Sequence, residues 1–165
     1  FKIVDKDTPL KGALSVVNSN LSENLRGLIE TIYNPGLINI DFVDLKTILD
    51  GKGRLAYLNS VIVDSSKEIK DTLKELTSSP FYSYSIEGAN GVLMNIMGSK
   101  NLGICAISEI SKTVSDLSKK NAKVVFGISQ ERKDKDKIQI VLLGVGCDFD
   151  FFDKKIGGKN RGLRK

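Results

Sequence analysis

The sequence predicts an α/β (α+β) fold, in which a four-stranded mixed sheet carries two helices on one face and is preceded by a long helix. Two observations predict it. After residue 53, strand and helix patterns follow one another in the order β-α-β-α-β-β. Before that point, apolar residues recur at helical spacing over residues 18–33. The 165 residues, 41% of them hydrophobic and 27% charged, suffice for one domain, or for one domain and a piece of another.

The first third of the chain is predicted to be helical. Thr8 and Pro9 begin a helical stretch that runs to about Asn18, and a longer helix follows. Asn34-Pro-Gly36 ends this helix, because proline has no amide N–H to donate and glycine tolerates a positive φ. A short helix is expected over about 42–50. The long helix has one continuous apolar stripe, formed by Leu21, Leu25, Leu28, Ile29 and Ile32.

The rest of the chain alternates between strand and helix patterns. Ser65-Ser-Lys-Glu68 has the form of a capping box and predicts the start of a helix. A second helix is expected along the stripe from Ile107 to Leu117. The link Glu131–Lys137 is too polar to bury and too short for a crossover, so it predicts an exposed hairpin loop between the last two strands. Strands are expected over residues 54–63, 91–97, 123–130 and 138–145.

The net charge of +5 is concentrated at one end of the chain. Residues 154–165 hold six of the 25 basic residues and no acid, which leaves 19 basic residues against 20 acidic ones elsewhere. The predicted domain is therefore nearly neutral, and we expect no nucleic-acid partner. The basic tail, residues 148–165, is either a solvated end or a contact for an acidic partner or a membrane surface.

Several kinds of site are excluded by composition. Cys105 and Cys147 lie far apart and the chain has no histidine, so neither a zinc site nor a Cys-His nucleophile is expected, and both thiols are interpreted as buried and free. The glycine pairs at 51–53, 88–91 and 157–158 lack the form of a phosphate-binding loop. No apolar stretch approaches the roughly 20 residues that span a bilayer.

Asn39, Asp41 and Asp44 are the candidate functional residues. If a helix begins near Asp41, the two carboxylates project from the same side of its first turn. Two carboxylates beside an amide can bind a metal, orient a water or accept its proton. The alternative is structural, because an aspartate at a helix N-cap with another acid in the first turn is ordinary capping chemistry.

The run Asn34-Pro-Gly-Leu-Ile-Asn-Ile-Asp-Phe-Val-Asp-Leu-Lys-Thr47 resembles the synergy loop of the FtsZ family, the tubulin-like cell-division GTPases. The family pattern reads Pro-Gly-Leu-Ile-Asn-x-Asp-Phe-Ala-Asp-x-Arg-Thr, so Val43 and Lys46 are mild departures. The resemblance covers nearly the whole chain to about residue 147. Further matching stretches follow in order at 78–80, 88–96, 121–127 and 138–141.

The resemblance implies that the chain is a fragment of a longer protein. Residues 1–17 resemble the end of the GTP-binding domain, and residues 18–52 the central helix, catalytic loop and following short helix. Residues 53–147 resemble the C-terminal α/β domain, followed by the basic tail. The phosphate-binding loop would precede Phe1, so the isolated fragment is not expected to turn over GTP.

The resemblance also implies a function. In the family this loop completes the active site of the neighbouring subunit in a head-to-tail protofilament, so Asp41 and Asp44 would polarise the water that attacks GTP, and Asn39 would position the loop. GTP, with Mg²⁺ in the intact protein, would be held mainly by the preceding domain. Asn18 and Ser19 would lie on the guanine side, although the family usually has an aspartate where this chain has Ser19.

The partners implied are other copies of the protein and, through the basic tail, a membrane adaptor or division proteins. The implied location is the cytoplasm at the division site, with no membrane span and no metal bound by this chain. Two other interpretations stay open. One is a non-catalytic interaction or regulatory module, in which the two aspartates only cap a helix. The other is a tubulin-like filament for DNA segregation.

Overall fold

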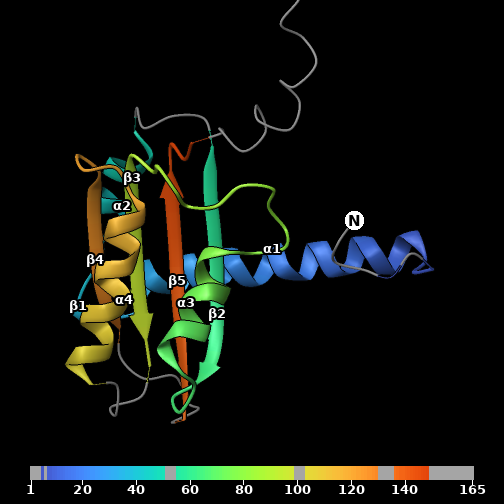
Figure 1. Cartoon of the computed structure of the whole chain (residues 1–165), viewed down its shortest axis with the longest axis horizontal. Helices are drawn as coiled ribbons and strands as arrows, with labels where there is room; N and C mark the ends of the chain where they lie inside the picture. Colours follow the sequence, from blue (N-terminus) through green and yellow to red (C-terminus); the bar gives the residue numbers. More distant parts are fainter. Residues whose placement is uncertain (1–4, 6, 51–54, 99–102, 130–135, 149–165) are drawn as a thin grey trace, which may run out of the picture.

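The computed structural model describes residues 5, 7–50, 55–98, 103–129 and 136–148. A five-stranded sheet in the order β1-β4-β3-β5-β2 has α3 and α4 on one face and α1 and α2 on the other (Figure 1). The elements in chain order are α1 (Leu10–Tyr33), β1 (Gly36–Ile38), α2 (Phe42–Leu49), β2 (Ala56–Asp64), α3 (Ile69–Thr77), β3 (Gly91–Met97), α4 (Ile104–Leu117), β4 (Lys123–Ser129) and β5 (Lys137–Val145).

The core lies on both faces of the central strands β3 and β5. Every residue of β3 is buried, because β3 pairs in parallel with β4 and antiparallel with β5 and is covered by helices on each side. Alternate side chains point to opposite faces. Val92 and Met94 therefore pack under α3 and α4, whereas Leu93 packs under α2 and the C-terminal part of α1. The mixed sheet and the two helices on one face are confirmed.

The sheet has five strands instead of the predicted four, because part of the loop after α1 joins its edge. β1 pairs antiparallel with β4, with Gly36 opposite Ser129. A side chain at Gly36 would meet the Ile128 carbonyl oxygen and would place its Cβ 2.8 Å from the Ser129 Cα. Glycine thus permits a close backbone approach. A strand of three residues is too short to show a two-residue period in the sequence.

The predicted hairpin between the last two strands is wrong. β4 and β5 are not neighbours, because β3 lies between them and pairs with both. One strand therefore separates β4 from β5, which places them roughly 10 Å apart at the usual strand spacing. Polarity of the link indicates exposure, but it does not tell which strands are adjacent. Most of the predicted loop, residues 131–135, lies outside the described part of the chain.

Two predictions about helix ends are also wrong. Residues Leu10–Tyr33 form one continuous helix, with no break near Asn18. Ser65 is not part of a capping box, because α3 starts after Glu68 and has no side-chain cap. Instead, the Ser65 N–H donates to the Asp136 carbonyl at 2.8 Å and extends the pairing of β2 with β5.

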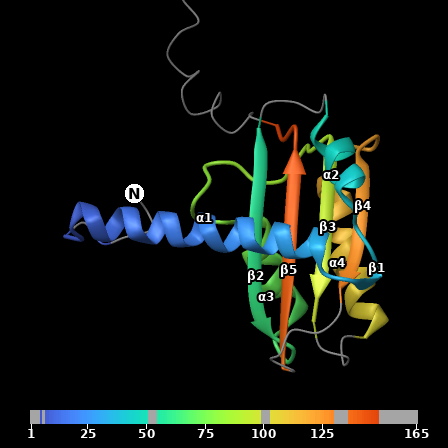
Figure 2. The same cartoon turned by 180° about the vertical axis from the view of Figure 1, so that it is seen from behind.

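α1 crosses the sheet and extends well beyond β2 (Figure 2). Its buried residues are Asn24, Gly27 and Thr31, which share one helical face. A Cβ at Gly27 would lie 3.0 Å from the side chains of both Ser60 and Gln139, so glycine lets the helix approach the sheet closely. Much of the apolar surface of α1 is instead exposed, at Leu10, Leu14, Val17, Leu21, Leu25 and Ile29.

Two further sequence predictions have mixed outcomes. Cys147 is buried and free as expected, but Cys105 is exposed because it lies in the first turn of α4, away from the sheet. The basic tail lies outside the described residues from position 149 onward, as does Gly157-Gly158. Within the described residues, no helix is long and apolar enough to cross a membrane.

Candidate functional site

The loop that carries Asn39, Asp41 and Asp44 is held at both ends. Asn39 accepts a hydrogen bond from the Gly36 N–H at its Oδ1, 2.7 Å away, which closes the turn after β1. Ile40 is only 3% exposed and packs into the core under α2. A Cβ at Gly127 would lie 2.6 Å from the Ile40 Cδ1, so this glycine of β4 makes room for the anchor. The loop is therefore a fixed connection between β1 and α2.

Asp41 and Asp44 form the capping box of α2. The Asp44 N–H donates to the Asp41 Oδ1 at 2.8 Å, and the Asp41 N–H donates to the Asp44 Oδ2 at 3.2 Å. The helix-capping interpretation is therefore correct for one oxygen of each carboxylate. Among the described residues, no hydrogen-bond partner contacts the Asp41 Oδ2 or the Asp44 Oδ1. Each acid thus retains an oxygen that can accept from a water or a ligand.

Exposed apolar side chains lie close to these acids in the sequence. Leu37 is 76% exposed, Phe42 66% and Val43 67%, and each is within four residues of Asp41. Exposed apolar clusters of this kind mark contact sites more often than free surface. We call these residues, together with Tyr33 and Ile38, the apolar collar.

A polar network that the sequence analysis missed positions the loop. Asn95, in the middle of β3 and 1% exposed, donates to the Thr31 Oγ1 at 3.2 Å and to the Ser129 Oγ at 2.9 Å. Thr31 lies in the last turn of α1, and Ser129 is paired with Gly36 of β1. The network therefore ties together the two elements that enter the loop. Asn24, Gly27 and Thr31 recur at helical spacing, and this pattern of small and polar residues could have revealed the buried face.

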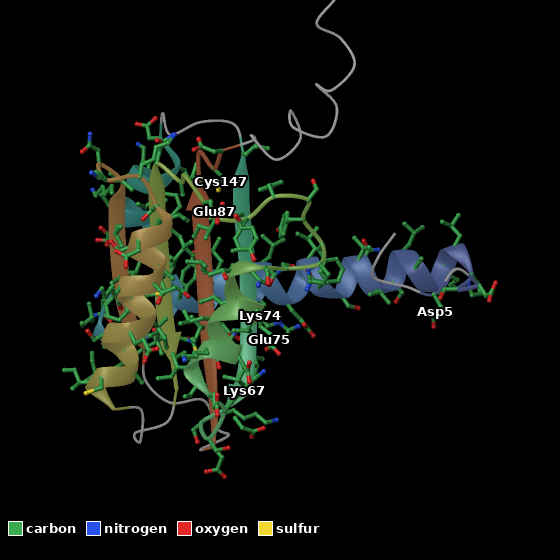
Figure 3. The ribbon with its side chains drawn as sticks, in the orientation of Figure 1. Asp5, Lys67, Lys74, Glu75, Glu87 and Cys147 are labelled. Atoms are coloured by element: carbon green, nitrogen blue, oxygen red, sulfur yellow. The ribbon has the colours of Figure 1, made fainter. Side chains whose placement is uncertain are left out.

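Asn18 and Ser19 lie far from the acids. Both are exposed and lie in the N-terminal half of α1, and Asp5, labelled in Figure 3, lies near the free end of this helix. A rise of 1.5 Å per residue places Asn18 about 22 Å from Tyr33, where the loop begins. One chain therefore does not bring the two predicted groups together. An open hollow of about 590 Å³ at this end is lined by Leu10, Lys11, Leu14, Ser15, Asn18, Ser19 and Ser22.

The perturbed pKa values lie away from the loop. Burial raises the pKa of Tyr57 to about 12, and burial also raises the pKa values of Tyr84 and Cys147. A cleft of about 500 Å³ lies between the N-terminal halves of α3 and α4, on the face opposite α1. Lys67, at its rim, pairs with Glu75 at 2.6 Å on the outer side of α3 (Figure 3). Among the described residues, no group of acids and cysteines could hold a metal ion.

Comparison with known proteins identifies the family. The model of the FtsZ family C-terminal domain matches residues 56–148, more than half of the chain. The chain belongs to the FtsZ family. It is 33% identical over 155 residues to cell division protein FtsZ 1 of Methanocaldococcus jannaschii, a match that covers 93% of this chain and 42% of that protein. The chain thus spans less than half the length of this relative.

Solved structures agree on the fold. An FtsZ dimer from M. jannaschii superposes with a TM-score of 0.73 at 32% identity, covering 88% of this chain and 42% of that one. A GTPγS-bound protofilament of CetZ2 from Haloferax volcanii gives a TM-score of 0.68, covering 92% of this chain and 47% of that one. At 15% identity, the CetZ2 match supports the fold alone.

Proposed function

We propose that this chain is the C-terminal part of a filament-forming cell-division GTPase. The loop from Asn34 to Asp44 would activate hydrolysis of the GTP held by the next subunit in a head-to-tail protofilament. Residues 1–17 would end the GTP-binding domain, residues 18–52 would connect it to the catalytic loop, and residues 53–147 would form the C-terminal domain. The filament would assemble in the cytoplasm at the division site, where the basic tail contacts an adaptor.

The observation that carries the proposal is the pair of open carboxylate oxygens on the same loop as the exposed residues of the apolar collar. Asp41 is exposed and Asp44 half-buried, on a loop held by β1 and by Ile40. The collar is a surface that a second protein can cover, with Leu37 and Phe42 among its most exposed members. Covering it would remove water from around the acids and leave their open oxygens facing the partner.

The distance along α1 favours a site that is shared between two subunits. Asn18 and Ser19, proposed to contact the guanine, are about 22 Å from the start of the loop. A single nucleotide bound at one end of α1 would not reach the acids at the other end. A head-to-tail contact solves this problem, because it joins unlike ends of successive subunits and can continue indefinitely. Solved structures with a similar fold include an FtsZ dimer and a GTPγS-bound CetZ2 protofilament.

The proposed chemistry needs only positioning and charge. Phosphoryl transfer to water requires an oriented nucleophile and stabilisation of the developing charge. The open oxygens of Asp41 and Asp44 would accept hydrogen bonds from the attacking water and direct its lone pair to the γ-phosphate. Asn39 would keep the turn in shape through its bond to Gly36. Mg²⁺ would be bound together with the phosphates of GTP, mainly by the GTP-binding domain.

Substitution by asparagine separates catalysis from capping. Asparagine caps a helix about as well as aspartate does, so Asp41→Asn should leave the stability of α2 nearly unchanged. It removes the negative charge, however, and should lower GTP hydrolysis by the full-length protein about 100-fold, with GTP binding retained. We expect the same of Asp44→Asn. Turnover is measured as phosphate release at equal polymer mass.

Asp50→Asn is the matched control. Asp50 is exposed at the opposite end of the same helix, where its N–H donates to the Lys46 carbonyl, and its side chain lies outside the loop. Hydrolysis by this variant should equal that of the native protein. If Asp41→Asn and Asp44→Asn both hydrolyse GTP at the native rate, the acids are helix caps only.

A further inference from the structure

The outer edge of β2 is the long free edge of the sheet. β2 pairs with β5 along its whole length, Ala56–Asp64, and has no strand on its other side in the described chain. Unpaired N–H and C=O groups on such an edge can bind a strand of another molecule. In an antiparallel ladder, alternate residues direct both backbone groups to the same side. Here the even-numbered residues of β2 direct theirs outward.

Three side chains form hydrogen bonds with outward-facing backbone groups of β2. The Tyr84 hydroxyl donates to the Ala56 carbonyl at 2.7 Å, and the Tyr82 hydroxyl donates to the Leu58 carbonyl at 2.9 Å. The Ser60 N–H donates to the Asn24 Oδ1 at 2.7 Å. Each of the two carbonyl groups thus has a hydroxyl donor, and the Ser60 N–H has a side-chain acceptor. We call Asn24, Tyr82 and Tyr84 the edge caps.

The edge caps are themselves held in place. Asn24 is 1% exposed, and its Nδ2 donates to the Asn20 Oδ1 at 3.0 Å. The Tyr82 ring lies 5.0 Å from that of Tyr57 and 5.3 Å from that of Tyr84, measured between centroids. The caps come from two segments far apart in the sequence, α1 and the connection before β3. The two segments cap different parts of β2: the tyrosines bond to Ala56 and Leu58 at its start, and Asn24 bonds to Ser60 at its middle.

The edge is capped at some of its outward groups and open at others. At the end of β2 the Asp64 carbonyl accepts a hydrogen bond from the Lys67 N–H at 3.0 Å, within the turn that leads to α3. Of the outward positions, Ile62 is the one where the structure shows neither backbone group bonded, and its side chain is 50% exposed. A strand that paired along the whole of β2 would have to displace the caps, because they occupy one outward group at each of Ala56, Leu58 and Ser60.

We propose that the edge caps close β2 to strand addition by a second copy of this chain. With the caps in place, copies cannot join their sheets through β2, and self-association is left to side-chain surfaces such as the apolar collar. Without them, two copies would pair their β2 strands antiparallel about a two-fold axis, the same patch meeting itself. This inference does not depend on the proposed GTPase function.

The test removes two of the edge caps and measures both how tightly copies of the chain associate and which amides become protected. In Tyr82→Ala/Tyr84→Ala, sedimentation equilibrium should show self-association at least about 10-fold tighter than in the native chain. Hydrogen exchange by NMR should then show the N–H groups of Ala56 and Leu58, which point outward, gaining protection as concentration rises. Val124→Ala is the control, because Val124 is 41% exposed on β4, which is separated from β2 by β3 and β5. It should not change the exchange of these amides.

A second variant removes the single cap that α1 provides. In Asn24→Ala, the Ser60 N–H loses its partner and should exchange at least about 10-fold faster at low concentration. An unchanged Ser60 rate would overturn the capping role of Asn24. The proposal as a whole fails if the double tyrosine variant associates no more tightly than the native chain. It also fails if that variant associates without protecting Ala56 and Leu58.

Discussion

Tyr57→Phe tests the most buried polar junction of the domain. Tyr57, on β2, is 0% exposed, and its hydroxyl donates to the Leu76 carbonyl at 2.8 Å, at the end of α3. The same oxygen accepts from the Ser79 N–H at 3.0 Å and from the Asn59 Nδ2 at 3.4 Å. The hydroxyl thus joins β2, the last turn of α3 and the segment that follows it. Phenylalanine keeps the ring and removes only this oxygen.

The size of the effect follows from which groups lose a partner. The Leu76 carbonyl keeps a hydrogen bond from the Asn59 Nδ2 at 3.0 Å, so it is not orphaned. The N–H of Ser79, a residue that is 7% exposed, loses its only partner shown in the structure. A buried unsatisfied donor costs about 1–3 kcal/mol. We therefore expect the free energy of unfolding to fall by about 2 kcal/mol, and Tm to fall by roughly 4–8 °C.

The raised pKa gives the same residue a second, independent signature. Burial raises the pKa of Tyr57 in the folded chain to about 12, above its value of 10.0 in the unfolded chain. The folded state therefore favours the protonated hydroxyl. Its contribution is complete below pH 10 and is lost as the pH rises from 10 to about 12. A pKa difference of this size corresponds to ~3 kcal/mol.

Urea unfolding at pH 8, 10 and 11.5 measures both effects. Tyr57→Phe should be less stable than the native chain at pH 8, and the gap should narrow steadily above pH 10, because only the native chain still has this hydroxyl to ionise. Tyr33→Phe is the control, since Tyr33 is 80% exposed, and its curve should follow the native one. Equal stability at pH 8, or a gap that stays constant up to pH 11.5, would refute the reasoning.

Two further substitutions test the supports of the loop. Gly36→Ala should detach β1 from β4, because its Cβ would collide with the Ile128 carbonyl oxygen. Urea unfolding should then show a lower free energy of unfolding, and GTP hydrolysis by the full-length protein should fall. Hydrolysis at the native rate would mean that β1 is not needed for the activity. Asn95→Ala removes the hydrogen-bond partner of the buried Ser129 hydroxyl. The free energy of unfolding should therefore fall by about 2 kcal/mol. A decrease of less than about 0.5 kcal/mol would show that the network contributes little to stability.

Secondary structure was largely predictable because it follows from local patterns. β3 appears within residues 91–97 as predicted, since an apolar run of that length between turn residues fits a buried strand. The start of α2 beside Asp41 was also predictable from capping chemistry. The capping box expected at Ser65 failed, because Ser65 instead bonds to Asp136, a residue far away in the sequence. Local signals fail where a distant backbone group competes for the same atoms.

The candidate site was predictable in its residues but not in its geometry. The order Asn39, Asp41, Asp44 and its resemblance to the FtsZ loop are visible in the sequence. The sequence does not show that one carboxylate oxygen of each acid accepts a backbone hydrogen bond while the other stays available to a ligand. It also does not show that Asn95 ties the two entering elements together. Both facts depend on which side chains meet in space.

By itself, the sequence determined the position of most helices and strands, the Pro-Gly break after the long helix, and the two acids that begin the next helix. Periodicity and turn chemistry act over a few neighbouring residues, so one chain contains them in full. Only the tertiary structure decided that α1 buries Asn24, Gly27 and Thr31 and leaves Leu21 and Leu25 exposed. The reason is geometric: a helix can present either face, and the polar groups of the sheet beneath it select the face that satisfies their hydrogen bonds.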